Sequence, residues 1–435
     1  MITDKIGPNN RKGNEMTSKP VTMAILGAGS RGYGYATFAQ RYPDRLQIAA
    51  VAEPDDFLRD RLAKEHGIPA DRCFRSWEEF CSQPKMCDAV AICTQDAMHE
   101  APAIACAGLK YHILLEKPMA PTAQACRNIV AAVKTAGVMF AVCHVLRYTH
   151  YTRILQDLIR SGAIGDIITI QHLEPVGYWH QAHAFVRGKW HSEAETSFML
   201  LAKSCHDIDW LRGIMGKPCT AVHSFGSLRH FRASEKPAGA ADRCIDCPRE
   251  VESNCPYSAY KIYFRDRFCK GVKTWPVNVL TPEVNTQTLA EALAAGPYGK
   301  CVYACDNDVV DNQVVNLEFA DGTTASMTMT AFTFHGARKT RIFGTRGEID
   351  TDSRVITVRD FLYDTVREID TGTVNDGGIL TAHGGGDLGL MEAFVSAVAE
   401  NDPSKIVTGI DETLESHLMV FAAEESRRTG TVVKL

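Results

Sequence analysis

The sequence predicts an α/β fold of two domains: a doubly wound parallel sheet, then an α+β domain with a large, mostly antiparallel sheet. Two observations lead to this prediction. Short apolar runs alternate with helical patterns up to about residue 145, whereas strand patterns joined by tight turns predominate after about residue 150. The length of 435 residues also suits two domains.

The domain boundaries follow from these patterns. We expect a disordered tail at residues 1–20, a first domain at 21–145 and a second at 146–435, with a Cys-rich insertion at about 233–305. The tail is polar and lacks the apolar core of a signal peptide, so we expect a cytoplasmic protein. The net charge of −5 gives no reason to expect nucleic acid as a partner. No apolar run reaches the roughly 18 residues that cross a bilayer, so we expect no membrane partner.

The first strand, residues 21–26, runs into the turn Gly27-Ala28-Gly29-Ser30-Arg31-Gly32, and a helix follows. In a G-x-G-x-x-G turn, the first glycine permits the tight bend, the second lets a pyrophosphate approach, and the third lets helix and strand pack. The helix N-terminus offers free N–H groups to an anion. The turn predicts a Rossmann dinucleotide site formed by Gly27, Gly29, Ser30, Arg31 and Gly32.

A second apolar run, residues 47–52, ends at Glu53. A carboxylate at this place accepts hydrogen bonds from a ribose 2′-hydroxyl and repels a 2′-phosphate. Glu53 therefore favours NAD over NADP.

Further strands are predicted at 89–93, 111–115 and 138–142, with a helix at 123–137 that Gly137 ends. Ligands of a parallel sheet bind at the carboxyl ends of its strands. Thr94, Glu116 and Lys117 follow such ends, and we predict that they contact the cofactor. His99 either lines the same pocket or caps its helix.

The second domain shows a different pattern. Residues 167–173 alternate like a half-exposed strand, and 314–319 and 324–329 flank Asp321-Gly322, which is a hairpin signal. More short strands are predicted at 339–343 and 355–359, and closing helices at 388–399 and 412–429. These elements predict an antiparallel sheet with helices on one face.

Three landmarks together resemble the Gfo/Idh/MocA oxidoreductase family: the glycine turn, Glu116-Lys117-Pro118 after a strand, and His206-x-x-Asp209 on a later helix. The resemblance implies that Lys117 lies between nicotinamide and substrate, and that a cis peptide joins it to Pro118. It further implies that His206 is the acid/base for a sugar or cyclitol hydroxyl, and that Arg147 lies near the cofactor.

The sequence departs from the family at one place. Relatives commonly carry an aspartate four residues before the histidine, where this chain has Ala202. Lys203 instead stands three residues before His206, on the same face of a regular helix, and Asp209 follows one turn later. We predict that Lys117, His206, Lys203 and Asp209 form the catalytic set. Lys203 would contact substrate hydroxyls, and Asp209 would act directly or orient a neighbour.

The segment from 178 to 190 is dense in aromatic and cationic side chains, which suit sugar binding by ring stacking and hydrogen bonding. The alternative is an exposed loop. The predicted substrate-binding residues are Tyr178, Trp179, His180, Lys189 and Trp190.

Fifteen cysteines are an unusually large number. Cys244, Cys247 and Cys255 have metal-like spacing, which would suit a structural zinc whose fourth ligand the sequence does not identify. The alternative is a set of reduced thiols or a labile disulfide.

These features predict an NAD-dependent oxidoreductase that transfers hydride between nicotinamide and a secondary hydroxyl of a sugar, glycoside or cyclitol. The alternative is an NAD-cycling glycoside hydrolase that acts by C3 oxidation, elimination, water addition and re-reduction. A third interpretation is a redox sensor that binds NAD, against which the presence of Lys117 and His206 argues. We expect a homodimer or homotetramer.

Overall fold

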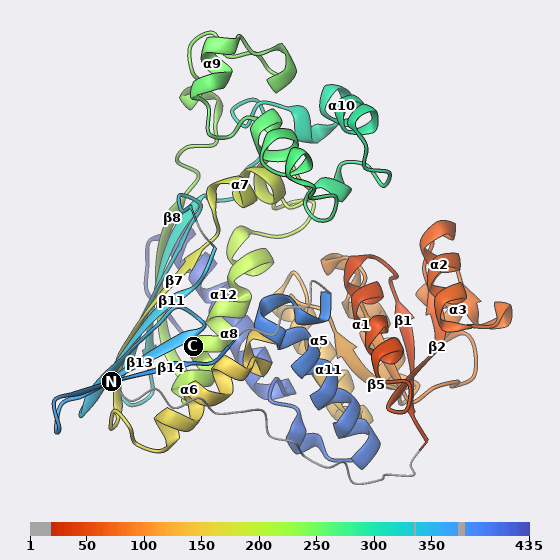
Figure 1. Cartoon of the computed structure of the whole chain (residues 1–435). Helices are drawn as coiled ribbons and strands as arrows, with labels where there is room; N and C mark the ends of the chain where they lie inside the picture. The colour runs from red at the N-terminus through yellow and green to blue at the C-terminus, as the bar shows by residue number, and fades with distance from the viewer. Residues whose placement is uncertain (1–18, 335, 373–378) are drawn as a thin grey trace.

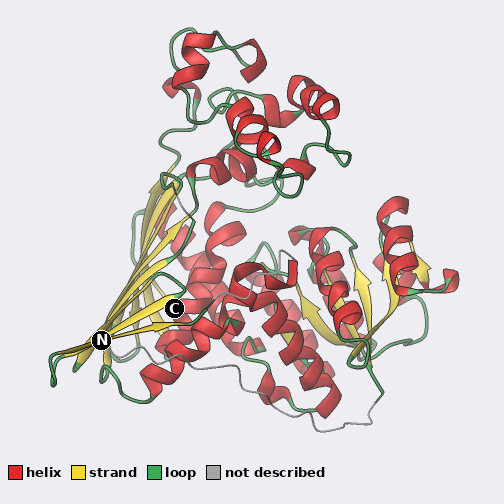
Figure 2. Cartoon of the chain, in the orientation of Figure 1, coloured by secondary structure: helices red, strands yellow, loops and turns green. Residues whose placement is uncertain are grey.

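Two sheets dominate the fold, each with its own helices (Figures 1 and 2). The computed structural model describes residues 19–334, 336–372 and 379–435. The predicted tail at 1–20 therefore lies almost wholly outside the described residues. Among the residues described, no helix combines the length and apolar character that a membrane crossing requires.

The first sheet has six parallel strands in the order β3-β2-β1-β4-β5-β6. This is the doubly wound order with a reversal at β1/β4, where such sheets bind their ligands. The strands are β1 (Val21–Leu26), β2 (Leu46–Ala52), β3 (Cys73–Phe74), β4 (Ala89–Ile92), β5 (His112–Leu115) and β6 (Phe140–Val142).

Local signals define the helices of this domain. The Asp55 side chain accepts from Leu58 N at the start of α2, and the Thr122 side chain accepts from Ala125 N at the start of α5. Gly137, with φ of 65°, ends α5 as predicted. The helices are α1 (Ser30–Arg41), α2 (Asp56–His66), α3 (Trp77–Cys81), α4 (Glu100–Gly108) and α5 (Ala123–Ala136).

The second sheet has nine strands in the order β14-β13-β12-β11-β7-β10-β9-β8-β15. Only the β7–β10 pair is parallel, and β9 and β10 form the predicted hairpin, with Gly322 at φ of 83° in its turn. The predicted fold class is confirmed. The strands are β7 (Ile167–Pro175), β8 (Cys219–Ser227), β9 (Asn312–Phe319), β10 (Thr324–Thr330), β11 (Lys339–Gly344), β12 (Gly347–Thr351), β13 (Val355–Asp360), β14 (Thr365–Asp370) and β15 (Val433–Lys434).

Helices cover one face of this sheet and separate it from the first domain (Figure 1). Leu211 of α8 and Val420 of α12 share a core with Val315 and Met327 of the sheet. The helices of this part are α6 (His150–Arg160), α7 (Tyr178–His180), α8 (Cys205–Met215), α9 (Arg249–Asn254), α10 (Thr286–Ala295), α11 (Ala382–Glu400) and α12 (Ile410–Thr429).

The chain between β8 and β9 forms a small helical lobe that carries α9 and α10, above α7 at one end of the sheet (Figure 1). Its apolar side chains, among them Tyr263, Leu289 and Val302, cluster with Ala182 and Val186 of the segment after α7. The lobe thereby stands next to the predicted substrate segment.

A buried guanidinium ties the segment after β6 to the helices of the second domain. Arg147, just after β6, contacts the Asp209 carboxylate at 3.4 Å, the Glu412 carboxylate at 2.8 Å and the Val407 carbonyl at 3.1 Å. Gly213 of α8 lies so close that a Cβ there would stand 2.2 Å from the Arg147 guanidinium carbon. These contacts place Arg147 in the connection between domains, and they give no support to its predicted role at the cofactor.

Arg147→Met should lower the free energy of unfolding by about 3–5 kcal/mol, because it leaves the fully buried Asp209 carboxylate without its cation. Urea unfolding measures the change. The control is Arg160→Met, which removes an exposed i,i+3 ion pair with Asp157 and should cost less than about 1 kcal/mol. Equal losses in the two variants would contradict the assignment.

Candidate functional site

The glycine turn between β1 and α1 has the shape that a dinucleotide requires. Gly27 has φ of 94°, and a Cβ there would stand 2.7 Å from the Cys93 carbonyl oxygen. A Cβ at Gly32 would stand 2.0 Å from the Gly27 carbonyl oxygen, so helix and turn touch there. A Cβ at Gly29 would meet nothing within 4 Å, and no side chain caps α1. The turn is therefore open to a pyrophosphate at Gly29, and the residues present fit the predicted cofactor.

Glu53 lies against this turn at the end of β2. Its carboxylate accepts hydrogen bonds from Ala28 N at 2.7 Å and Asp55 N at 3.0 Å, and the residue is 8% exposed. Both contacts fix the carboxylate beside the glycine backbone.

A buried carboxylate, Glu116, joins the turn to the next strand end. Glu116 accepts hydrogen bonds from Arg31 and Tyr35 of α1, and from its neighbour Lys117 N at 2.9 Å. Burial alone would raise the pKa of Glu116, but the charges of Arg31 and Lys117 and these hydrogen bonds lower it to about 2. Arg31 also pairs with Asp387 of α11, so its charge is neutralised within the protein.

His99 is fully buried beneath the strand ends. Its Nδ1 lies 2.8 Å from the Pro118 carbonyl oxygen and its Nε2 lies 3.2 Å from the Thr94 carbonyl oxygen. The ring makes no side-chain cap to α4. The imidazole therefore fixes Thr94 to the Lys117-Pro118 turn, and the Thr94 hydroxyl itself donates to the Met98 carbonyl.

Lys117 reaches from the first domain into the second. The cis Lys117-Pro118 bond that the resemblance implies is present, and Lys117 Nζ donates to the Ala202 carbonyl at 2.9 Å. Ala202 lies in a π-helical turn, Leu200–Ser204, which immediately precedes α8. The wide turn thus supplies an acceptor for the lysine.

His206, in the first turn of α8, lies beside this lysine. Its side chain is almost fully buried, and its Nδ1 has no hydrogen-bond partner among the described residues. Burial, then the charge of Lys117, lower the pKa of His206 well below its usual value. The ring is therefore neutral near pH 7 and can accept a proton.

The predicted row of Lys203, His206 and Asp209 spans two kinds of helix. Lys203 lies in the π-helical turn that ends at Ser204, and it pairs with the buried Glu174 of β7 at 3.2 Å, whereas His206 and Asp209 lie on α8. Asp209 accepts from Ser416 at 2.9 Å and pairs with Arg147. Asp209 also lies 3.9 Å from His144 Nε2, so it stands next to the histidines of the site.

Two further histidines surround His206 that sequence reasoning missed. The ring of the fully buried His144 lies 5.6 Å from the ring of His206, and that of His383 lies 6.1 Å away. His383 Nδ1 lies 2.8 Å from Asp387 Oδ2. The run of three glycines between His383 and Asp387 is the local sequence signal that marks this segment as unusual.

The predicted substrate segment divides into two parts. Trp179 and His180 pack against Trp275 of the insertion, with ring distances of 5.3 Å and 5.1 Å, and the Arg267 guanidinium lies 3.8 Å above the Trp179 ring. The charge of Lys203 reaches His180, whose pKa is lowered mainly by burial. No local sequence pattern predicted that Trp275 and Arg267 lie here.

The remaining predicted substrate residues lie elsewhere in the segment. Tyr178 contacts Tyr257 and Phe334, while Trp190 packs against Phe185 and the core of the second domain. Lys189 is exposed and covers the Trp190 ring. Of these residues, His180 lies near Lys203, and the Trp179 ring stacks beside His180 at 5.6 Å.

The predicted zinc site at Cys244, Cys247 and Cys255 does not form. Within residues 19–334, 336–372 and 379–435, no group of three or more His, Cys, Asp or Glu side chains is arranged to hold a metal ion. The Cys244 sulfur instead accepts from the Arg187 guanidinium at 3.5 Å and from Ala259 N at 3.4 Å. A neighbouring cation disfavours a bound metal, and burial raises the pKa of Cys255, which keeps it a thiol.

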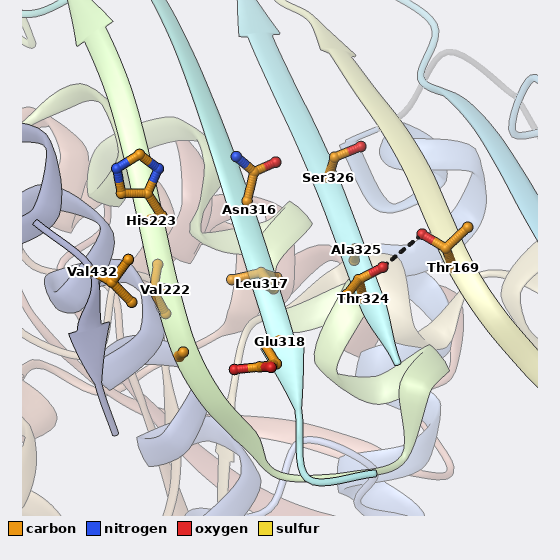
Figure 3. Close-up of a pocket in the computed structure, with 11 residues that line it drawn as sticks. Thr169, Val222, His223, Asn316, Leu317, Glu318, Thr324, Ala325, Ser326 and Val432 are labelled. Atoms are coloured by element: carbon orange, nitrogen blue, oxygen red, sulfur yellow. Dashed lines mark hydrogen bonds between the residues drawn. The ribbon is translucent and has the colours of Figure 1, made fainter. Parts of the chain in front are cut away.

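Two hollows lie on the face of the nine-stranded sheet that its helices do not cover. Figure 3 shows one of them, lined by side chains of β7, β8, β9 and β10, among them His223, Asn316 and Glu318. Thr169 and Thr324 hydrogen-bond across it at 2.9 Å. The second hollow lies over β7 and β10–β13. Neither hollow includes a predicted site residue.

Comparison with known proteins places these features in a family. Two models of the Gfo/Idh/MocA oxidoreductases match the chain: the NAD-binding Rossmann fold at residues 21–144 and the C-terminal alpha/beta domain at residues 156–435. A levoglucosan dehydrogenase solved with NADH and levoglucosan has the same fold, with a TM-score of 0.68 at 19% identity over 96% of this chain and 99% of that chain.

Curated relatives match only part of the chain. The 2,7-anhydro-N-acetylneuraminate hydratase of Escherichia coli (strain K12) is 27% identical over 212 residues, which are 48% of this chain and 54% of that protein. The 1,5-anhydro-D-fructose reductase of Ensifer adhaerens is 32% identical over 170 residues, 38% of this chain and 49% of that protein. The chain thus spans about half the length of the curated relatives it matches.

Lowering the pH from 7 to 5 should destabilise the protein, at pH values above those at which carboxylates usually titrate. Burial lowers the pKa of His144 and of His417 to about 3, whereas a histidine of the unfolded chain titrates near ~6.5. Below about pH 6.5 the unfolded chain therefore binds more protons than the native state, and the free energy of unfolding falls as the pH falls. Urea unfolding at pH 7 and pH 5 should show this loss.

His144→Phe should reduce the loss between pH 7 and pH 5 by about 2 kcal/mol, which is one group over about 1.5 pH units. His150→Phe is the matched control, because His150 is exposed. An unchanged pH dependence in His144→Phe would contradict a buried, neutral His144.

Proposed function

The chain belongs to the Gfo/Idh/MocA oxidoreductase family, and from this premise we propose that it transfers hydride between NAD and a secondary hydroxyl of a sugar, glycoside or cyclitol. The observation that carries the proposal is the placement of Lys117 and His206. A cation that reaches across the domains lies next to a neutral, unpaired imidazole, at the strand end beside the glycine turn.

The residues that would hold the cofactor follow from the open turn. Gly29, Ser30 and the N–H groups at the start of α1 suit the pyrophosphate, and the Glu53 carboxylate suits the ribose hydroxyls. When bound, NAD supplies the acceptor and donor of hydride. Arg31 is occupied by Glu116 and Asp387, so it offers little charge to a 2′-phosphate.

Lys117 and His206 have different roles at the substrate oxygen. The neutral His206 accepts the hydroxyl proton as the carbon is oxidised, and it returns that proton on reduction. The Lys117 ammonium stabilises the negative charge that develops on the oxygen. Burial of His206 keeps water away, so the charge on Lys117 acts in a medium of low dielectric.

The remaining surface suits a carbohydrate. Trp179 offers an aromatic ring, and Lys203 offers hydrogen bonds to hydroxyls while Glu174 fixes its position. Trp275 and Arg267 of the insertion would belong to the same substrate-binding surface. The levoglucosan in the related dehydrogenase is a substrate of this class.

The second candidate is the NAD-cycling glycoside hydrolase, in which the oxidised state is transient. Two observations favour it. One relative is named a hydratase, and adding or removing water involves no net oxidation or reduction. Elimination also needs more than one proton-transferring group, and His383 lies beside His206.

The outer face of the nine-stranded sheet supports a homodimer or homotetramer. Phe225 of β8, two residues after the His223 that lines the hollow in Figure 3, is 61% exposed, and Ile168 of β7 is 52% exposed. Exposed apolar side chains gathered on one face are typical of an interface. We therefore assign this face to contact with a second copy of the chain.

Glu53→Ser should weaken NAD binding by roughly tenfold to a hundredfold and improve NADP binding, because it removes hydrogen bonds to a charged group and the repulsion of a 2′-phosphate. Calorimetry with both cofactors measures the change. Glu53→Gln is the matched variant: it removes the charge and one of the two acceptor oxygens but keeps the length of the side chain. If the native protein binds NADP as tightly as NAD, the assignment of Glu53 is wrong.

Lys117→Ala and His206→Asn should each lower turnover by about 10²–10⁴-fold without weakening NAD binding. A panel of levoglucosan, other glycosides and myo-inositol supplies the substrates, and reduction of the nicotinamide is followed by absorbance. Lys134→Ala on α5 is the control, because Lys134 is exposed and distant in the fold. Full turnover in either site variant would remove that residue from the mechanism, and a protein that binds NAD but reduces none would favour a sensor.

A further inference from the structure

We propose that His383, oriented by Asp387, is a second acid–base group of this site, which moves a proton between water and the carbon next to a substrate carbonyl. The inference rests on the proposed function, because it requires a ketone sugar at Lys117 and His206. It adds a role for a histidine that hydride transfer itself does not use.

The Asp387 carboxylate fixes the state of the His383 ring. His383 Nδ1 lies 2.8 Å from Asp387 Oδ2, so Nδ1 carries the proton and donates it to the carboxylate. Nε2 is then left as the base. Asp387 is only 1% exposed, and Arg31 holds its other oxygen, so the carboxylate is itself fixed in place.

The position of His383 complements that of His206. The two ring centres are 6.1 Å apart, so both can face one bound substrate. The His383 side chain is 40% exposed, whereas His206 is 7% exposed. A proton taken from carbon must reach water, and His383 has access to solvent that His206 lacks.

The backbone holds His383 in an uncommon conformation. His383, Gly384 and Gly385 have φ of 50°, 67° and 84°, all in the left-handed region. A left-handed histidine is strained, and such strain persists only where surrounding contacts enforce it. Gly386 supplies one of these contacts, since a Cβ there would stand 2.3 Å from the Val145 carbonyl oxygen. The loop is therefore packed in one arrangement that presents the ring.

The proposed step balances without an oxidant. The C–H bond next to the carbonyl breaks, its proton forms a bond to His383 Nε2, and the electron pair moves onto the carbonyl oxygen as an enolate. The Lys117 ammonium stabilises that oxygen. Return of a proton from His383, after exchange with water, restores the ketone. In the second candidate function, the same carbanion would expel the neighbouring leaving group.

Solvent deuterium exchange tests this step directly. Protein loaded with NAD⁺ is incubated in D₂O with 1,5-anhydro-D-fructose, a ring ketone that oxidised cofactor cannot reduce. Proton NMR follows loss of the C–H signals next to the carbonyl. The native protein should accelerate exchange, and His383→Asn should slow it by about 10²-fold or more, because asparagine tolerates the left-handed backbone but is no base.

A second readout separates this role from a structural one. Reduction of the same ketone by NADH uses Lys117 and His206, so His383→Asn should retain it within a few fold. Asp387→Asn should lower exchange as well, because the ring loses its fixed tautomer. His150→Asn, an exposed histidine at the start of α6, is the control.

Each outcome has one meaning. Exchange lost with reduction retained in His383→Asn supports the proposal. Equal loss of both, or full exchange in the variant, overturns it. If the native protein reduces the ketone but does not exchange it, only this inference fails. If the native protein does neither, the proposed function fails with it.

Discussion

The Glu116 carboxylate is the interaction on which the rest of the site depends. It is buried, it accepts from Arg31 and Tyr35 of the helix after the glycine turn, and it orients the backbone of Lys117. Arg31 extends the network to Asp387 and hence to His383. One ionised group thus joins the dinucleotide turn, the lysine and the second histidine. Because a buried carboxylate is stable only while its cations are in place, this network holds three distant chain segments in one geometry.

A second constraint sets the electrostatics around His206. Lys117 is anchored on the carbonyl of a π-helical turn in the other domain, and the histidines beside it are buried. Burial and the lysine charge both favour neutral imidazoles, so the site combines one cation with histidines that are uncharged near pH 7. That combination suits chemistry in which an oxygen becomes negative while a proton leaves.

Local sequence signals predicted what local geometry determines. The glycine turn, the strand end at Lys117 and the Asp321-Gly322 hairpin each depend on a few consecutive residues, and the structure contains all three. Features that depend on distant partners could not be predicted. Arg147 contacts Glu412, 265 positions away, and Trp275 meets Trp179 only because the insertion folds back. The Lys203 prediction assumed a regular helix, whereas Lys203 lies in a π-helical turn and pairs with Glu174, 29 positions earlier in the chain.

A crystal structure of the protein with NAD⁺ tests the central claim most directly, because it locates the nicotinamide relative to the three residues assigned to the chemistry. The account predicts that the pyrophosphate lies on the backbone at Gly29 and that the nicotinamide ring lies in contact with Lys117, on the side where His206 and His383 face it. A nicotinamide ring bound away from Lys117, or density for the cofactor anywhere other than the glycine turn, would contradict it.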